Sequence, residues 1–237
     1  MTPPSSTPEA ITELIAEWKT EKKPEQKRIS WNRERWQALD PRYPKIASHK
    51  TFIAGLPNRI GREDVRGYAA GAAKSPDRAV EAFIASMVWG FGSTGYGVYR
   101  TNRILTVNPD APERLHSVAQ ILTSDGPVEG YRAMANEQRL KWLGPAFGTK
   151  YLYFCSADDN PALVLDALVA VWLNQHCGTN LRPWQWSTLQ YEKYVTDMAS
   201  WAGRTCTSVE LETIVFTAEA SSREGNQWGT KDSGKKQ

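Results

Sequence analysis

Apolar residues recur at helical spacing along most of the chain, and this periodicity constrains the fold more than any other feature of the sequence. Residues 78–89 and 188–203 place apolar side chains three and four positions apart, as amphipathic helices do. Alternation with a period of two, which is typical of a half-buried strand, is scarce. Proline, glycine, serine and asparagine separate the helical segments. The sequence therefore predicts an all-α fold.

The ends of the predicted helices follow from proline, glycine and capping residues. The other helices are expected at 8–25, 31–39, 62–72, 112–122, 128–143, 150–156, 162–174 and 208–220. Residues 45–61 are expected to be irregular. The glycine-rich segment 90–97 is expected to be a turn between helices, because it lacks the Gly-Lys-Ser/Thr ending of a phosphate-binding loop. We expect a partly disordered extension with one helix (1–30), a helical domain (31–220) and a disordered tail (221–237).

Composition and charge exclude several classes of protein. A net charge of +3 over 237 residues excludes a polybasic binder, although a local basic face stays open. No apolar run reaches the about 18 residues of a membrane helix, and the N-terminus lacks the features of a secretory signal. Three scattered cysteines and three distant histidines indicate neither a zinc site nor a disulfide framework. We therefore expect no cofactor, no metal and a cytoplasmic protein.

The segment 143–173 carries the clearest chemical signal. Gly144 and Gly148 bracket three residues in a tight turn, after which a helix is expected to begin at about Thr149. Backbone N–H groups at such a helix start form a site for an anion such as a phosphate. Lys150 is expected in the first turn of that helix.

Asp166 interrupts an otherwise apolar run sixteen residues after Lys150. A carboxylate among apolar side chains is costly to bury without a partner. A lysine beside a buried aspartate is an arrangement in which the amine acts as a nucleophile and the carboxylate orients it. Other interpretations stay open: the lysine could be a solvated surface residue, and the aspartate could cap a helix or form a salt bridge.

The pair of segments GTKYL (148–152) and VLDALVAVW (164–172) resembles the helix-hairpin-helix DNA glycosylases, specifically their 8-oxoguanine DNA glycosylase branch. There a hairpin carries the catalytic lysine and a following helix carries the catalytic aspartate. The resemblance implies a hairpin at 143–150, Lys150 as the Schiff-base nucleophile and Asp166 as its catalytic partner. It also implies two helical lobes with the active site in the cleft between them.

The segment ETIVFTAEA (212–220) is similar to the last helix of that branch, where a Gln and a Phe four residues later bind the flipped base. The resemblance implies a base pocket with Phe216 at the stacking position and Glu212 in place of the Gln. Cys155 is assigned to the same pocket, with a structural role as its alternative. The expected DNA contacts are Gly144, Phe147, Gly148, Thr149, Arg100 and Arg103.

The chain also departs from the family pattern. Its hairpin is one residue longer and contains the bulky Phe147, and it has no four-cysteine cluster for iron–sulfur. We also expect it to lack the N-terminal β-lobe of the eukaryotic enzymes. Glu212 offers only hydrogen-bond acceptors, which suit the N–H groups of a guanine-type base or the amino group of a cytosine.

The resemblance implies a monomeric, nucleoid-associated enzyme for base excision repair, with no membrane partner. It would flip a modified base, such as an oxidised guanine, out of double-stranded DNA, excise it and act as an AP lyase. Two alternatives stay open. One is a defence glycosylase that removes modified bases, such as modified cytosine, from phage DNA. The other is a helix-hairpin-helix DNA-binding module without catalysis.

Overall fold

The structure is a computed structural model that describes residues 6–21, 27–38 and 40–223. The described residues form thirteen helices and one two-stranded sheet, which confirms the all-α prediction. They divide into two compact units, a larger one built from 28–164 and 184–188 and a smaller one built from the rest. The disorder predicted for the N-terminus and the tail lies almost entirely outside the described residues.

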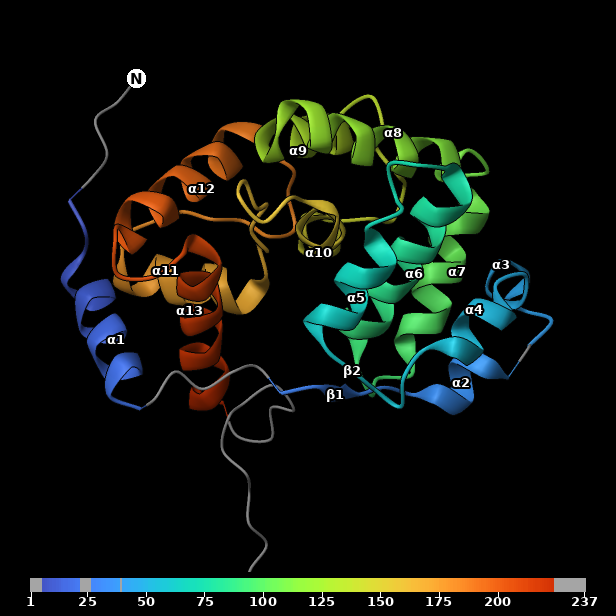
Figure 1. The fold of residues 1–237 in the computed structure, drawn as a ribbon, viewed down its shortest axis with the longest axis horizontal. Helices are drawn as coiled ribbons and strands as arrows, with labels where there is room; N and C mark the ends of the chain where they lie inside the picture. The colour runs from blue at the N-terminus through green and yellow to red at the C-terminus, as the bar shows by residue number, and fades with distance from the viewer. Residues whose placement is uncertain (1–5, 22–26, 39, 224–237) are drawn as a thin grey trace, which may run out of the picture. The chain divides into compact units, whose positions relative to one another are not determined.

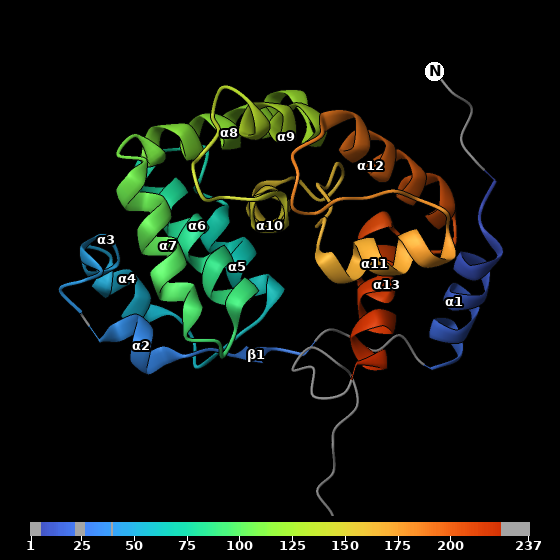
Figure 2. The ribbon, with the colours of Figure 1, turned by 180° about the vertical axis from the view of Figure 1, so that it is seen from behind.

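The larger unit begins with a short antiparallel ladder in which Ile29 pairs with Ile60. Its strands are β1 (Ile29–Ser30) and β2 (Arg59–Ile60), and its helices are α2 (Arg33–Gln37), α3 (Pro44–Ala47), α4 (Lys50–Gly55), α5 (Arg62–Ala69), α6 (Pro76–Phe91), α7 (Tyr96–Val107), α8 (Ala111–Asp125), α9 (Pro127–Ala135) and α10 (Pro145–Cys155). Figure 2 shows α2, α3 and α4 near one end of α7.

Helix α6 forms the centre of the larger unit, because it is apolar on almost every side. Ser75 caps it by accepting a hydrogen bond from the Arg78 N–H, and Pro76 stands at its first position. It packs against α5, α7, α8 and α10 (Figure 1). The long apolar run of α6 therefore holds α10, the helix of Lys150, inside this unit.

Helix α10 is fixed on two sides by aromatic residues. The Phe83 and Tyr151 rings meet edge to face with centroids 6.2 Å apart, and the Tyr151 hydroxyl donates to the Leu115 carbonyl of α8 at 2.9 Å. The Trp89 and Phe154 rings meet in the same way at 5.1 Å. These contacts fix both the rotation and the depth of α10.

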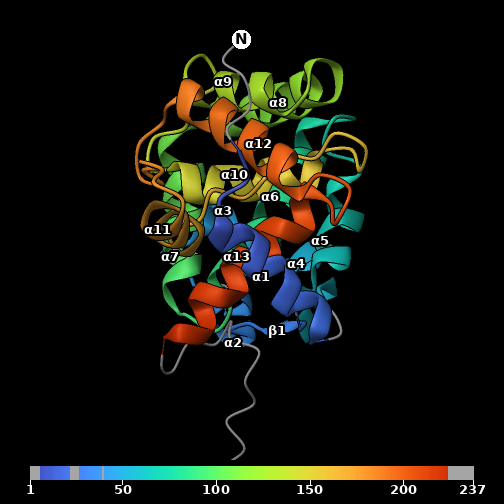
Figure 3. The same ribbon diagram turned by 90° about the vertical axis from the view of Figure 1, so that its left-hand side faces the viewer.

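The smaller unit contains α1 (Glu9–Thr20), α11 (Ala167–His176), α12 (Thr188–Ala202) and α13 (Ser208–Ser222). Helix α13 packs against both α1 and α11 (Figure 3). Helix α13 begins with a reciprocal capping box formed by Thr207 and Glu210. Because the capping box fixes the first residue of α13, it also determines which residues lie on the same face of that helix.

Several predicted boundaries are wrong. Residues 45–61 are not irregular, because α3, α4 and β2 lie there; these elements are too short to show a periodicity. The helix predicted at 128–143 ends at Ala135, since the Asn136 side chain donates to the Arg132 carbonyl and the chain then turns. The other predicted helices agree within a few residues, except for those around Lys150 and Asp166 and for α1, which ends at Thr20; residues 22–25 of its predicted range lie outside the described residues. Helix α7 was not predicted. None of the described helices is both long and apolar enough to cross a membrane.

Candidate active site

Lys150 lies in the second turn of α10 and is 5% exposed. Its Nζ donates to the Ala146 carbonyl at 3.1 Å and lies 5.0 Å from the centroid of the Phe147 ring. The prediction that the helix begins at about Thr149 is wrong, because Gly144 is the N-cap and Pro145 the first helical residue. Lys150 is therefore a buried lysine within a helix, not a residue at the helix end.

The side chain of Lys150 passes over a glycine of α6. A Cβ atom on Gly90 would lie 3.0 Å from Lys150 Cδ and 2.7 Å from Cε1 of Phe147. The Phe147 ring in turn stacks on Phe91, with centroids 4.2 Å apart and an interplanar angle of 19°. The absence of a side chain at Gly90 thus leaves room for the lysine beneath an aromatic pair.

The residues predicted to contact DNA through the hairpin occupy two kinds of environment. Gly144 and Phe147 are partly exposed at the start of α10. Gly148 is buried under the Trp186 ring, and Thr149 is buried with its hydroxyl donating to the Pro145 carbonyl at 2.8 Å. The side chain of Thr149 therefore stabilises the helix, and the DNA-binding roles of all four residues stay predictions.

Trp186 is a packing residue of the larger unit. Its Nε1 donates to the Leu143 carbonyl at 3.2 Å, and its ring lies 5.0 Å from that of Tyr131. The ring fills the space above Gly148 and fixes the segment that leads into α10.

Asp166 is the N-cap of α11, and its carboxylate accepts a hydrogen bond from the Leu168 N–H at 2.9 Å. The prediction that it interrupts an apolar helix is wrong: residues 162–165 are buried but not helical, and the helix begins only at Ala167. Asp166 is partly exposed. Its capping bond orients the carboxylate at the start of α11.

Glu212 and Phe216 lie one turn apart on α13, so they share one face of the helix. Glu212 is 1% exposed and Phe216 is 9% exposed. Both belong to the smaller unit together with Asp166, and the helix that Asp166 caps packs against α13. The predicted base-binding pair therefore does share a face, while its role in binding a base stays a prediction.

Cys155 is the last residue of α10. Burial raises the pKa of its thiol to about 12, against an ordinary value of 9.0, and a hydrogen bond with Tyr151 lowers it in part. The thiol is therefore protonated at neutral pH, which excludes Cys155 as a nucleophile there. A neutral apolar group suits either the structural role or the pocket wall predicted for it.

The structure places Arg100 and Arg103 on α7 beside Trp142, a residue that the sequence did not single out. The Cζ of Arg103 lies 3.5 Å from the centroid of the Trp142 ring. Tyr96, Tyr99, Arg100 and Arg103 repeat at helical spacing, a signal that was missed because no helix was assigned to 96–107.

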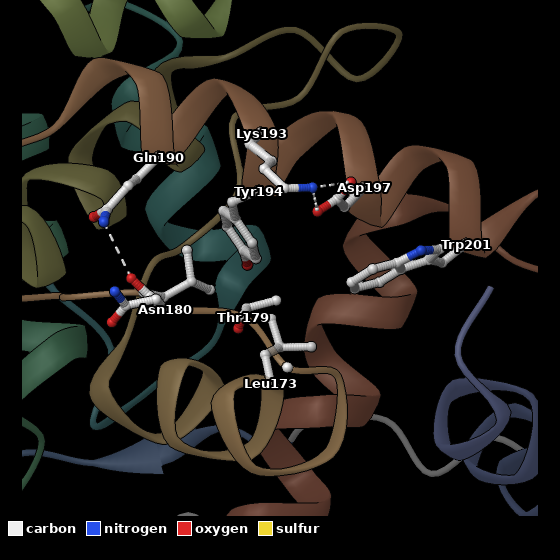
Figure 4. Close-up of a pocket in the computed structure, with 10 residues that line it drawn as sticks. Leu173, Thr179, Asn180, Gln190, Lys193, Tyr194, Asp197 and Trp201 are labelled. Atoms are coloured by element: carbon white, nitrogen blue, oxygen red, sulfur yellow. Dashed lines mark hydrogen bonds and ion pairs between the residues drawn. The ribbon is translucent and has the colours of Figure 1, made fainter. Parts of the chain in front are cut away.

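A pocket of about 220 Å³ lies in the smaller unit, between α12 and the loop after α11 (Figure 4). Lys193 and the buried Asp197 form an ion pair at 2.7 Å on its wall, and Gln190 donates to the Asn180 carbonyl at 3.1 Å. None of the predicted site residues lines it. In the described part of the chain, no group of three or more His, Cys, Asp and Glu could hold a metal ion.

Comparison with known families places the chain among DNA glycosylases. Residues 22–216 match the family described as "Putative 8-oxoguanine DNA glycosylase OGG-like protein", and the chain belongs to this family. No curated protein and no solved structure matched the chain. The resemblance to the 8-oxoguanine branch is thus confirmed, and DNA is the substrate that the family implies.

Proposed function

We propose that the protein is a DNA glycosylase with AP-lyase activity that excises a modified base and uses Lys150 as its nucleophile. One observation carries the proposal: a chain of this family holds a lysine almost completely buried on α10, with Gly90 leaving room for its stem. A lysine amine is a nucleophile that forms Schiff bases, so a lysine held at this place can supply the proposed chemistry. Its position also matches the catalytic lysine that the sequence motif implies.

In the proposed reaction the neutral amine of Lys150 attacks C1′ of the flipped nucleotide. The glycosidic C1′–N bond breaks, and its electron pair leaves with the base. Loss of the amine proton and opening of the sugar ring give a Schiff base between Nζ and C1′. Loss of a proton from C2′ then expels the 3′ phosphate with the electron pair of the C3′–O bond, which cuts the strand and accounts for the lyase activity.

Asp166 stabilises the cationic sugar in this proposal. A carboxylate lowers the energy of a developing positive charge if it is oriented before the reaction. The bond from the Leu168 N–H supplies that orientation, since it fixes one oxygen at the start of α11.

Glu212 and Phe216 bind the base in this proposal, Phe216 by stacking and Glu212 by accepting hydrogen bonds. In this proposal Glu212 binds as a carboxylate, which cannot donate a hydrogen bond, so the base presents N–H groups to it. Guanine-type bases and amino-bearing pyrimidines fulfil this condition, whereas a face made only of carbonyl groups does not.

Borohydride trapping tests the proposal. Reduction of the Schiff base would join the protein covalently to DNA with an abasic site, and we expect this adduct for the native chain. Lys150→Gln should lose the adduct yet keep DNA binding, whereas Lys74→Gln, at an exposed lysine, should form it normally. An unchanged adduct in Lys150→Gln would remove Lys150 from the mechanism. DNA binding without any adduct from the native chain would favour the non-catalytic module.

A further inference from the structure

An exposed surface of aromatic and arginine residues lies on α7 and on the connector between α9 and α10. It consists of Tyr96, Tyr99, Arg100, Arg103 and Trp142, and we call it the Trp142 surface. The side chains of its three aromatic residues are exposed: Tyr96 is 51% exposed, Tyr99 36% and Trp142 46%. Large rings are usually mostly buried, and a group of exposed ones marks an interaction site.

The side chains of the Trp142 surface are already ordered by one another. Arg103 Cζ lies 3.5 Å from the Trp142 ring centroid and 5.8 Å from that of Tyr99, to whose hydroxyl its guanidinium also donates. Arg100 Cζ lies 5.4 Å from the Trp142 centroid. Both guanidinium groups are therefore held against aromatic faces, which lowers the entropy cost of binding a ligand.

Trp142 is held in an unfavourable backbone conformation. Its φ is +72°. Every other positive φ among the described residues belongs to a glycine. The buried Asn108 fixes the neighbouring residue, accepting from the Lys141 N–H at 2.9 Å and donating to the Lys141 carbonyl at 3.1 Å. A bulky residue stays in this region only where its surroundings impose it, and such positions concentrate at functional sites.

The charges of the Trp142 surface are not neutralised by carboxylates. Within the described ranges, neither Arg100 nor Arg103 forms an ion pair, whereas Asp110, just beyond the end of α7, pairs with Arg114 at 2.7 Å. Lys141 is exposed and adds a third positive charge beside Trp142. The surface therefore combines positive charge with open aromatic faces, which is the chemistry that binds a nucleic acid strand.

We propose that the Trp142 surface binds an unstacked nucleotide of a DNA strand, with the base on the exposed part of Trp142 and the adjacent phosphates on Arg100 and Arg103. Stacking tolerates every base, and guanidinium groups pair well with phosphate oxygens. Trp142 comes two residues before Gly144, the N-cap of the helix that carries Lys150. The inference rests on the proposed function only in taking DNA as the ligand, and it assigns a contact outside the catalytic residues.

The test compares binding of a fluorescently labelled, short single-stranded oligodeoxynucleotide with binding of a blunt, undamaged duplex, by anisotropy. We expect Trp142→Ala to raise the Kd for the single strand about tenfold, because it removes one stacked base, and to change the Kd for the duplex far less. Trp142→Phe keeps a ring and should recover most of the affinity. A Trp142→Ala protein that is folded by circular dichroism and binds the single strand like the native chain would overturn the proposal.

The phosphate contacts have a separate readout. Replacing both Arg100 and Arg103 by Gln should reduce the slope of log Kobs against log salt concentration by about 1.4, at about 0.7 for each contact to a single strand. Arg78→Gln is the control, since Arg78 already pairs with Glu81 at 3.1 Å, and it should leave the slope unchanged. An unchanged slope in the double variant would refute the phosphate contacts.

The two proposals fail separately. If Trp142→Ala weakens single-strand binding but the native chain forms no borohydride adduct, the inference stands and the proposed chemistry fails. If the adduct forms and Trp142→Ala binds normally, the chemistry stands and the inference fails.

Discussion

Gly90→Ala tests directly how α6 leaves room for Lys150. The added Cβ would lie 2.7 Å from Phe147 Cε1 and 3.0 Å from Lys150 Cδ. Because carbon atoms normally pack at about 3.5–4.0 Å, both side chains must move by roughly 0.5–1 Å. Phe147 stacks on Phe91, so its ring cannot move without disturbing a second ring.

Two opposing terms set the size of the effect on stability. Alanine in place of glycine inside a helix stabilises by about 0.5–1 kcal/mol, and the gain at Gly90 is near the lower value because α6 ends at Phe91. Overpacking a well-packed site costs about 1–3 kcal/mol. The free energy of unfolding should therefore fall by about 0.5–2.5 kcal/mol.

Gly67→Ala is the matched control. Gly67 lies in α5 of the same unit, is exposed, and would place a Cβ with no other atom within 4 Å. It should stabilise the chain by about 0.5–1 kcal/mol. Urea unfolding followed by circular dichroism measures both variants, so the difference between them isolates the overlap at Gly90. If Gly90→Ala raises the free energy of unfolding as much as Gly67→Ala does, the described packing around Lys150 is wrong.

The same variant has a functional consequence. A displacement of about 1 Å in a reacting group reduces the rate of its reaction on the order of 100-fold. Gly90→Ala should therefore slow borohydride trapping at saturating abasic DNA, even though Lys150 is still present and DNA binding is kept. A variant that is destabilised as expected but traps at the native rate would show that the amine's position does not depend on Gly90.

Two further predictions concern Cys155 and Glu212. Iodoacetamide at pH 9 should alkylate Cys155 on the order of 100-fold more slowly in the folded chain than in urea, because its pKa is raised from 9.0 to about 12; mass spectrometry of the modified peptide measures this. The same thiol makes the unfolding free energy fall as pH rises from 9 toward 12, since the unfolded chain loses that proton first. Glu212→Gln should change which base is excised from a panel of modified oligonucleotides, while Glu219→Gln, at an ion-paired residue on the same helix, should not. An identical panel for Glu212→Gln and the native chain would place Glu212 outside the base pocket.

Periodicity predicted most of the long helices, although it missed the twelve-residue α7, and it predicted the short helices poorly. Helix α6 follows from its apolar run and α13 from its capping box, because each signal is contained within a few turns of chain. Helices α3 and α4 are four and six residues long, so neither repeats its pattern often enough to be recognised. Their positions depend on packing in the larger unit, which a local pattern does not contain.

The candidate site was predicted in its residues but not in its local geometry. The motif identified Lys150 and Asp166, yet each was assigned to the wrong place in a helix. Pro145 at the first position is the signal that starts α10 early, and it was treated as part of a turn. Asp166 is a good N-cap residue, an alternative that the sequence left open and the structure supports.

Trp142 could not have been found from the sequence, because a positive φ at a bulky residue is imposed by contacts distant in the chain. The contact that fixes it comes from Asn108, thirty-three residues before Lys141. Arg100 and Arg103 were predicted as DNA contacts, but only the structure shows that their partners are aromatic rings rather than carboxylates.

The distribution of arginine partners explains how a chain with a net charge of only +3 can bind DNA. Many described arginines are neutralised locally by carboxylates: Arg28, Arg42, Arg66, Arg78, Arg114, Arg132 and Arg223. Exposed pairs of this kind add little stability, but they cancel charge on the surface around them. Arg100 and Arg103 are paired with rings instead and keep their full charge. DNA binding by this chain should therefore depend on a few phosphate contacts, and those of Arg100 and Arg103 should contribute to its salt dependence.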